Sequence, residues 1–402
     1  MRSVIFGSDN SNPDTVAASY NCINATIFSS WSSNQNLRRV VVPGPMTLSN
    51  YYLQTDVPPG LGASYTFTVL KNGSPTSLAI VIADTATTGS DTTHSVSFAA
   101  GDTLSLQSTP SNSPATLSVE SWNMLVDTPD QTAPVLSMSG APSTSTTNYG
   151  VLTGGQAASN GWSATESDMQ IVVPTSGALS NLYNVVSAAP GSGKSWQYTL
   201  MVNGSATALQ TTLSGTATTA NNTANSVNVS AGDTISLRCV PSGTPTSSLP
   251  TFSMTFTPTV NGESFFGYGS AAAPLAGTSY EQPLGLGNNA WTANEANRPM
   301  LFGPYTITKM YIKLNTAPGA GTSRVFTVRK AAANTALTAT IADTATTANV
   351  ASNVAFAQGN QLTLQSATGT GSPATATGGV HAGFLIYMPP PPTTFVPQIM
   401  IY

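Results

Sequence analysis

The chain has 402 residues, of which 12 are Lys or Arg and 16 are Asp or Glu, so its net charge is −4 at pH 7. Charged residues make up 7% of the chain, against about 25% in an average soluble domain, and this balance leaves no basic surface for nucleic acid. Two cysteines and two histidines exclude a disulfide scaffold and a His-rich metal site, and no apolar run approaches the ~20 residues of a membrane-spanning helix.

The N-terminal segment 1–8 does not have the form of a secretory signal, because its apolar run stops at Phe6 and polar residues follow at once. We therefore expect a protein that is made in the cytoplasm without an export signal. A mature secreted protein, from which a signal has been removed, is the alternative, although the Met at position 1 weighs against it.

The segment 65–106 predicts β-strands in the first third of the chain. Aromatic and aliphatic residues alternate with threonine over 65–69, which is the period of a half-buried strand. The Asn-Gly pair at 72–73 indicates a hairpin, because both central positions of a type I′ turn need a positive φ. Further strands are expected at 78–82 and 103–106, and no stretch holds a helical periodicity over three turns.

Landmarks recur along the chain in constant order, and Trp31, Trp162 and Trp291 lie 131 and 129 residues apart. The other landmarks are Leu-Ser-Asn-Tyr near 48, 179 and, loosely, 307; Pro-Gly-x-Gly at 59–62, 190–193 and 318–321; the strand at 65–74, 196–205 and 324–333; Thr-Ala-Thr-Thr at 85–88, 216–219 and 344–347; and Gly-Asp or Gly-Asn at 101–102, 232–233 and 359–360. The sequence therefore predicts an internal triplication with a repeat of domain size.

Proline-rich segments at 128–134 and 257–262 mark the boundaries between the repeats. The expected domains are three β-sandwich repeats, 1–130, 131–260 and 261–388, and a Pro-rich C-terminal arm, 389–402. Seven or eight short strands per repeat without a helical layer predict an all-β fold of three tandem antiparallel β-sandwich domains. We expect them to be jelly-roll-like, because immunoglobulin-like domains are shorter and carry a Cys…Trp…Cys spacing that is missing here.

The arm begins with four prolines at 389–392, which enforce polyproline II and cannot join a central strand. Its end is apolar. The candidate partner-docking side chains are Phe395, Val396, Ile399, Met400, Ile401 and Tyr402. An arm that reaches into a neighbouring subunit and a tail that folds back on its own domain are both open interpretations.

Acidic residues give two candidate sites, and each has a simpler interpretation. Asp102 and Asp233 follow a turn glycine, and Asn360 stands at the third position, so these side chains are expected to cap turns. Glu166 and Asp168 follow Trp162 and would lie on one side of a strand, either as a weak Ca²⁺ or sugar site or as a solvated strand edge.

The sequence contains few residues that could act in catalysis. His94 and His381 fall in different repeats, and no Gly-x-Ser-x-Gly elbow precedes a helix. Cys22 and Cys239 have no metal-ligand spacing and are expected to be buried, and a bridge between them needs domains 1 and 2 to pack closely. We therefore predict no enzyme, no catalytic residue, no metal and no cofactor.

Trp31, Trp162 and Trp291 are the candidate ligand-binding residues. An exposed Trp in each repeat suits stacking on a sugar and gives one site per repeat, whereas a buried Trp anchors each sandwich. Both interpretations are open on the sequence.

Tandem jelly-roll-like domains, scarce charge, richness in Ser, Thr, Ala and Gly, no signal and an apolar arm together resemble the virion structural proteins of bacteriophages, which are decoration, fibre or tail-associated proteins. The resemblance covers the whole chain at the level of architecture, and motifs such as 71–74 and 100–106 define no single family. It implies a non-enzymatic virion protein, made in the host cytoplasm and released by lysis. Its domains and arm would dock on other virion proteins, including copies of itself, with no nucleic acid or membrane partner.

Two other classes of function stay open on the sequence. One is a carbohydrate- or receptor-binding adhesin, extracellular or at a cell surface, that binds a host surface glycan, and the other is a polysaccharide-degrading enzyme. Three linked domains suit a three-fold or quasi-three-fold position, or else a spike in which they stack in line.

Overall fold

The computed structural model describes residues 1–26, 30–155, 161–286, 291–298, 300–373 and 379–389 of the chain. This part of the chain is all-β and holds 30 strands in six sheets, together with three short 3₁₀ turns. The sheets pack in pairs, which we call unit 1 (2–127), unit 2 (133–258) and unit 3 (263–387). The prediction of an all-β chain with antiparallel sheets is confirmed, and the paired sheets are consistent with β-sandwich domains.

Unit 1 shows the strand order that all three units share. One sheet holds, in order, β1 (Arg2–Asp9), β9 (Glu120–Asp127), β4 (Met46–Thr55) and β7 (Thr88–Phe98). The other holds β2 (Ser19–Asn21), β8 (Thr103–Ser111), β5 (Gly60–Lys71) and β6 (Ser74–Asp84), with β3 (Val40–Val41) also on β8. With the short β3 left aside, the first sheet contains the first, eighth, third and sixth strands, and the second sheet the second, seventh, fourth and fifth.

Units 2 and 3 repeat this order. Unit 2 has β12 (Gly154–Gly155), β10 (Ala133–Met138), β20 (Pro250–Pro258), β15 (Gly177–Val186) and β18 (Thr219–Val229), against β13 (Trp162–Ser163), β11 (Asn148–Gly150), β19 (Thr234–Ser242), β16 (Gly191–Val202) and β17 (Ser205–Gly215), with β14 (Ile171–Val172) on β19. Unit 3 has β23 (Gly285–Leu286), β21 (Glu263–Ser270), β30 (Val380–Tyr387), β25 (Thr306–Leu314) and β28 (Thr347–Ala355), against β22 (Ser279–Glu281), β29 (Asn360–Thr368), β26 (Gly319–Lys330) and β27 (Ala333–Asp343), with β24 (Met300–Phe302) on β29. The two parallel pairings described are β10 with β12 and β21 with β23.

The predicted Asn-Gly hairpin is confirmed between β5 and β6. Asn72 and Gly73 have φ values of 50° and 84°, which is the conformation that a two-residue hairpin needs and that Asn and Gly adopt most easily. The third unit keeps the same turn without this pair, and Ala331 and Ala332 take φ values of 47° and 61°. Alanine is strained in this region, so the fold of unit 3 holds a turn that its local sequence does not favour.

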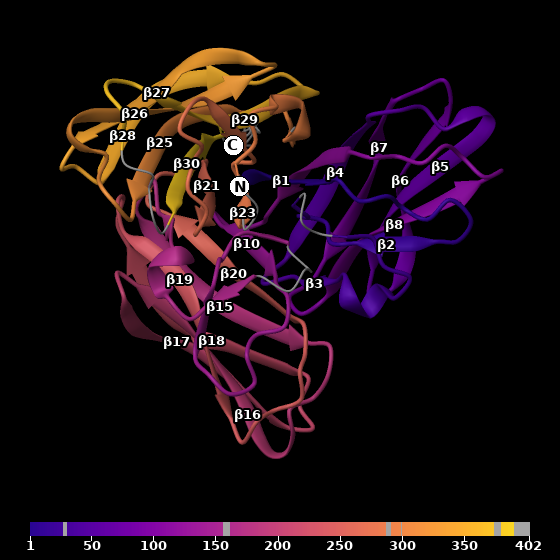
Figure 1. The fold of residues 1–402 in the computed structure, drawn as a ribbon. Helices are drawn as coiled ribbons and strands as arrows, with labels where there is room; N and C mark the ends of the chain where they lie inside the picture. The colour runs from indigo at the N-terminus through magenta and orange to yellow at the C-terminus, as the bar shows by residue number, and fades with distance from the viewer. Residues whose placement is uncertain (27–29, 156–160, 287–290, 299, 374–378, 390–402) are drawn as a thin grey trace, which may run out of the picture.

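The three units close into a ring, which Figure 1 shows as three lobes around the N-terminus. In unit 1 the short strand β3 contacts β10, β15 and β20 of unit 2. The equivalent β14 of unit 2 contacts β21, β25 and β30 of unit 3, and β24 of unit 3 contacts β1 and β9 of unit 1. Each unit therefore binds the next through the same element, and the described units do not stack in line.

The cores of the units interlock in the same cyclic order. Leu136 and Met138 of unit 2 belong to the buried cluster of unit 1, and Phe265 of unit 3 belongs to that of unit 2. Phe6 and Leu125 of unit 1 complete the ring in the cluster of unit 3. Since burial of a large apolar side chain contributes roughly 1.5–3 kcal/mol, the junctions stabilise the ring as part of its cores.

The described residues contain no helix that has the length and apolar character needed to cross a membrane.

Candidate functional site

The three repeated tryptophans lie at equivalent places, on the segment that pairs with the second strand of each unit. Trp162 pairs directly with Gly150, and the residues after Trp31 and Trp291 bridge to Tyr20 and Tyr280. Each indole packs on two core aromatic rings at centroid distances between 6.0 and 6.5 Å. The three tryptophans that align between the repeats in the sequence therefore occupy equivalent positions in the three units.

The tryptophans differ in their exposure. Trp291 is 2% exposed and has no open ring face for a sugar, so it serves as a core anchor in this structure. Trp31 and Trp162 are half-buried, and their indole N–H groups are directed to the protein: Trp31 Nε1 lies 3.4 Å from Glu120 Oε2, and Trp162 Nε1 donates to the Gly140 carbonyl at 2.7 Å. Ligand binding at these two residues stays a prediction.

A buried polar cluster lies beneath Trp31, and the sequence did not indicate it. Asp9 and Glu120 are direct neighbours across the β1–β9 ladder, and both are fully buried. Asp9 accepts hydrogen bonds from the Ser11 backbone N–H at 2.5 Å and from Asn21 Nδ2 at 2.6 Å. Glu120 and Asp9 lie far apart in the sequence, so only the strand register brings them together.

Burial controls the charge of this pair. It raises the pKa of Asp9 to about 7, although the hydrogen bonds from Ser11 and Asn21 and the charge of Arg38 oppose this. Burial and the neighbouring Asp9 raise the pKa of Glu120 well above its ordinary value. Burial thus favours the protonated form of both carboxyls, and for Glu120 the adjacent negative charge of Asp9 adds to this effect.

The same place differs in the other two units. In unit 3, Glu281 and Arg298 form a buried ion pair at 3.0 Å, and burial raises the pKa of Glu281 to about 7 against the attraction of Arg298. In unit 2, Gly150 and Met169 occupy the positions of this pair, and the Trp162 ring packs directly over Gly150.

The other acidic candidates have structural partners. Asp102 and Asp233 accept hydrogen bonds from Asn72 and Asn203 at 2.7 and 2.8 Å and from turn backbone N–H groups, which supports the turn-capping interpretation. The expectation that Glu166 shares a strand face with its neighbour is wrong: Glu166–Asp168 is a 3₁₀ turn closed by backbone hydrogen bonds. Glu166 accepts from Ser236 Oγ at 2.9 Å.

The remaining chemistry-bearing residues are dispersed. His94 is paired with Asp91 at 2.9 Å on the surface of unit 1, and His381 is buried in unit 3, where its Nδ1 lies 2.7 Å from the Gln170 carbonyl of unit 2. Cys22 and Cys239 are both buried, and neither forms a disulfide bond. Among the described residues no group of three or more His, Cys, Asp or Glu side chains is placed to hold a metal ion.

An equivalent glycine–tyrosine contact joins each pair of neighbouring units. The pairs, with the distance from a Cβ built on the glycine to the tyrosine, are Gly101–Tyr183 (3.9 Å), Gly232–Tyr311 (3.8 Å) and Gly359–Tyr52 (3.0 Å). The three glycines have φ values between 80° and 97°, so each allows both the turn and the approach of the ring. The repeated Gly-Asp and Gly-Asn landmarks therefore lie at the junctions.

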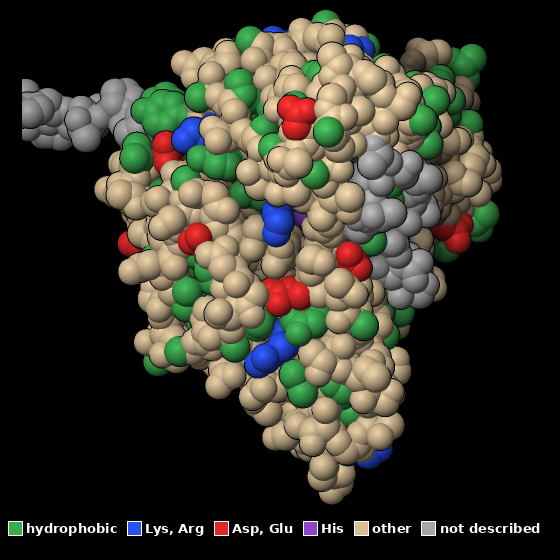
Figure 2. All heavy atoms as spheres, turned by 60° about the vertical axis from the view of Figure 1, so that its left-hand side comes forward, with side chains coloured by type: hydrophobic (Ala, Val, Ile, Leu, Met, Phe, Trp, Pro, Cys, Tyr) green, Lys and Arg blue, Asp and Glu red, His purple; other side chains and the backbone are tan. Residues whose placement is uncertain are grey.

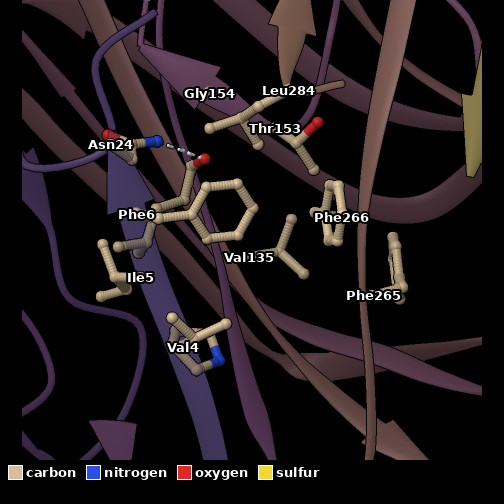
Figure 3. A pocket seen from close by; sticks show the side chains of 12 residues that line it. Val4, Ile5, Phe6, Asn24, Val135, Thr153, Gly154, Phe265, Phe266 and Leu284 are labelled. Carbon is tan, nitrogen blue, oxygen red and sulfur yellow. Dashed lines mark hydrogen bonds between the residues drawn. The ribbon is translucent and has the colours of Figure 1, made fainter. Parts of the chain in front are cut away.

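The first strands of the units meet at the centre of the ring, around a small cavity of about 50 Å³. Figure 3 shows Phe6, Val135 and Phe266, one from each unit, around this cavity. The cavity is small, with room for one or two water molecules, so the side chains that line it are closely packed.

Polar contacts at the centre follow the cyclic order at two junctions. Asn24 Nδ2 of unit 1 donates to the Leu136 carbonyl of unit 2 at 2.8 Å, a bond drawn in Figure 3. Thr153 Oγ1 of unit 2 donates to the Gly267 carbonyl of unit 3 at 2.7 Å. At the junction of unit 3 with unit 1 the equivalent position holds the buried apolar Leu284.

A larger cavity, of about 230 Å³, lies between units 1 and 3. Tyr52, Leu125 and Tyr305 supply much of its apolar lining, and Asn50 and Gln358 are among its polar residues. A cavity of mixed aromatic and polar lining has the composition of a small-ligand site.

The face of the molecule in Figure 2 is largely uncharged, with a few Lys, Arg, Asp and Glu side chains, some next to one another, among scattered hydrophobic side chains. The candidate docking side chains of the arm, from Phe395 to Tyr402, lie outside the described residues.

No protein-family model and no curated protein matches the sequence.

Proposed function

We propose that this chain is a non-enzymatic structural protein of a virion, as a capsid decoration, fibre or tail-associated component. It docks on other virion proteins through its β domains and the C-terminal arm 389–402. In this proposal the units are jelly-roll domains at 1–130, 131–260 and 261–388, which arose by internal triplication. The strand orders in the two sheets are those expected of a double-sheet jelly roll.

The observation that carries the proposal is the closed ring of three sandwiches with an almost uncharged surface. The ring has interlocked cores and equivalent junctions, which give a rigid body with three related outer surfaces. Such a surface, with 7% charged residues in the chain, suits extensive static contacts better than long-range steering of a soluble ligand.

Sedimentation of the source lysate tests the proposal. Particles are separated on a density gradient, and this chain is quantified by mass spectrometry in each fraction. We expect it to co-migrate with DNA-filled particles in a fixed copy number, which would then separate decoration from fibre. Recovery only in soluble or cell-wall fractions would contradict the proposal.

The cavity between units 1 and 3 favours a second candidate, the binding of a surface glycan or another small ring-shaped ligand. Its half-buried Tyr52 is suited to one face of a sugar, and the exposed Gln358 to its hydroxyls. A glycan array with the full chain, repeated with Tyr52→Ala, tests it. Binding that Tyr52→Ala leaves intact would exclude this cavity.

A further inference from the structure

One exposed segment is identical in all three units, whereas each of its flanking residues is shared by only two of them. Thr-Ala-Thr-Thr occupies the turns 85–88, 216–219 and 344–347, between β6 and β7, β17 and β18, and β27 and β28. The first and last threonines of every copy are exposed. On the preceding strand, the equivalent exposed residues are Val81, Thr212 and Thr340, which are not the same.

The fold does not account for these threonine side chains. Where a repeated threonine is needed, the structure shows its role: Thr76, Thr207 and Thr335 each donate to the carbonyl of the residue seven positions earlier, at 2.7–2.8 Å. Within the described chain, no hydrogen bond involves the side chains of the first or last threonine of the three turns. The turn itself is closed by a backbone bond, such as Ala86 N–H to the Ala83 carbonyl, which any residue provides.

The residue before each turn behaves differently. Asp84, Gly215 and Asp343 have φ values of 55°, 61° and 55°, so a residue that tolerates positive φ is required, and its identity changes between units. Backbone geometry thus explains the variable position and leaves the identical one unexplained. Identical exposed residues in three equivalent turns suit identical external contacts.

The closed ring fixes how the three turns are arranged. Units that contact one another through equivalent elements, 1 to 2, 2 to 3 and 3 to 1, are related by about a third of a full turn around one axis. Equivalent residues of the units therefore lie at the corners of a triangle on the same side of the ring. Thr85, Thr216 and Thr344 form such a triangle.

We propose that the three Thr-Ala-Thr-Thr turns are the docking elements of the ring, and that they bind three equivalent sites on a three-fold or quasi-three-fold assembly of another virion protein. This inference rests on the proposed virion function and adds the surface and the symmetry of the partner. One chain then replaces a trimer and sits with its pseudo-three-fold axis on the axis of the partner.

The chemistry of the turns suits a neutral protein surface. Threonine has a hydroxyl that can donate one hydrogen bond and accept others, and a methyl group that packs on apolar atoms. Each turn alone is a small contact, but three rigidly linked contacts bind with an avidity that can exceed a single one by about 10²–10⁴. Loss of one turn should therefore weaken binding strongly without abolishing it.

The experiment uses particles purified from a lysate in which the gene for this chain is disrupted, with the recombinant full chain added back. The variants are Thr85→Lys alone, and the triple variant Thr85→Lys, Thr216→Lys and Thr344→Lys. The matched control is Val81→Lys, Thr212→Lys and Thr340→Lys, which adds the same charge at equivalent exposed positions outside the turns. Unchanged melting temperatures establish that the variants fold.

We expect the wild-type chain and the control to bind at one copy per three copies of the partner, on its three-fold axes in electron cryomicroscopy. The single variant should bind at least about 10-fold more weakly, and the triple variant should stay unbound. Equal binding of the triple variant and the control, or density away from a three-fold axis, would overturn the inference while leaving the virion function intact. Failure of the wild-type chain to bind any particle would overturn both.

Discussion

Units 1 and 2 share a strand order but differ beneath their tryptophans. Unit 1 buries Asp9, Glu120 and Arg38 there, whereas the equivalent residues of unit 2 are Ser139, Pro250 and Met169. Because unit 2 forms the same sheets without this cluster, the buried charges of unit 1 are not needed to specify the fold. Buried ionic groups are often exchangeable for well-packed apolar residues.

The indole N–H groups of the two tryptophans also have different partners. In unit 2 the Trp162 ring covers Gly150 directly, and its N–H is satisfied by a backbone carbonyl. In unit 1 the indole N–H is directed to Glu120, so the packing of Trp31 depends on a titratable side chain. The composition of unit 3 is intermediate between those of units 1 and 2, because it has one buried ion pair, Glu281–Arg298, under the buried Trp291.

The largest expected loss of stability comes from replacing only one residue of the Glu281–Arg298 pair of unit 3 by its counterpart in unit 2. Arg298→Met leaves Glu281 buried without its cation, and breaking a buried ion pair in this way costs about 3–5 kcal/mol. The double variant Glu281→Gly with Arg298→Met recreates the pair Gly150 and Met169 and should recover much of the loss. Denaturant unfolding of the full chain measures both, and a single variant as stable as the wild type would contradict the comparison.

A smaller effect is expected from pH. The folded-state pKa values of Asp9 and Glu281 are raised to about 7, and that of Glu120 is also raised, so between pH 4 and 7 the folded chain binds more protons than the unfolded one. Stability from these groups is therefore highest at the acid end of this window and falls as pH rises. The melting temperature should drop from pH 5 to pH 8, and less so for Glu120→Gln.

Asp91 provides the control for this prediction. Hydrogen bonds from His94, Thr93 and Ala79 outweigh its desolvation and lower its pKa to about 2. The stability that it contributes is complete above the unfolded pKa of about 4 and is lost only in stronger acid. Asp91→Asn should lower the melting temperature equally at pH 5 and pH 8, and a loss confined to one of these pH values would show that Asp91 contributes to the dependence.

The smallest effect is expected at an exposed ion pair of the same unit. Arg2 and Asp127 are 2.9 Å apart, but their side chains are 42% and 39% exposed. Solvent screens such pairs, so Arg2→Met should change the stability by only about 0–1 kcal/mol. A loss comparable to that of Arg298→Met, measured in the same denaturant series, would mean that burial does not separate the two kinds of charge.

Local sequence was most informative where the backbone needs a particular residue. The Asn-Gly hairpin follows from the positive φ that its turn requires, and the turn-capping role of Asp102 follows from its place after Gly101. The 3₁₀ turn at Glu166 was missed, because a three-residue turn has no periodicity that separates it from a short strand. The pair of Asp9 and Glu120 was missed because strand pairing between the two ends of a unit leaves no local pattern.

The sequence by itself determined the all-β class, the recurring landmarks and the scarcity of charge, since alternation, turn residues and composition are local properties of the chain. The tertiary structure decided that the units close into a ring, that Trp291 is buried while Trp31 and Trp162 are half-buried, and that two carboxyls meet in the core of unit 1. These features depend on which surfaces meet after the sheets have formed, and contacts between residues more than 100 positions apart are set by packing rather than by local preference.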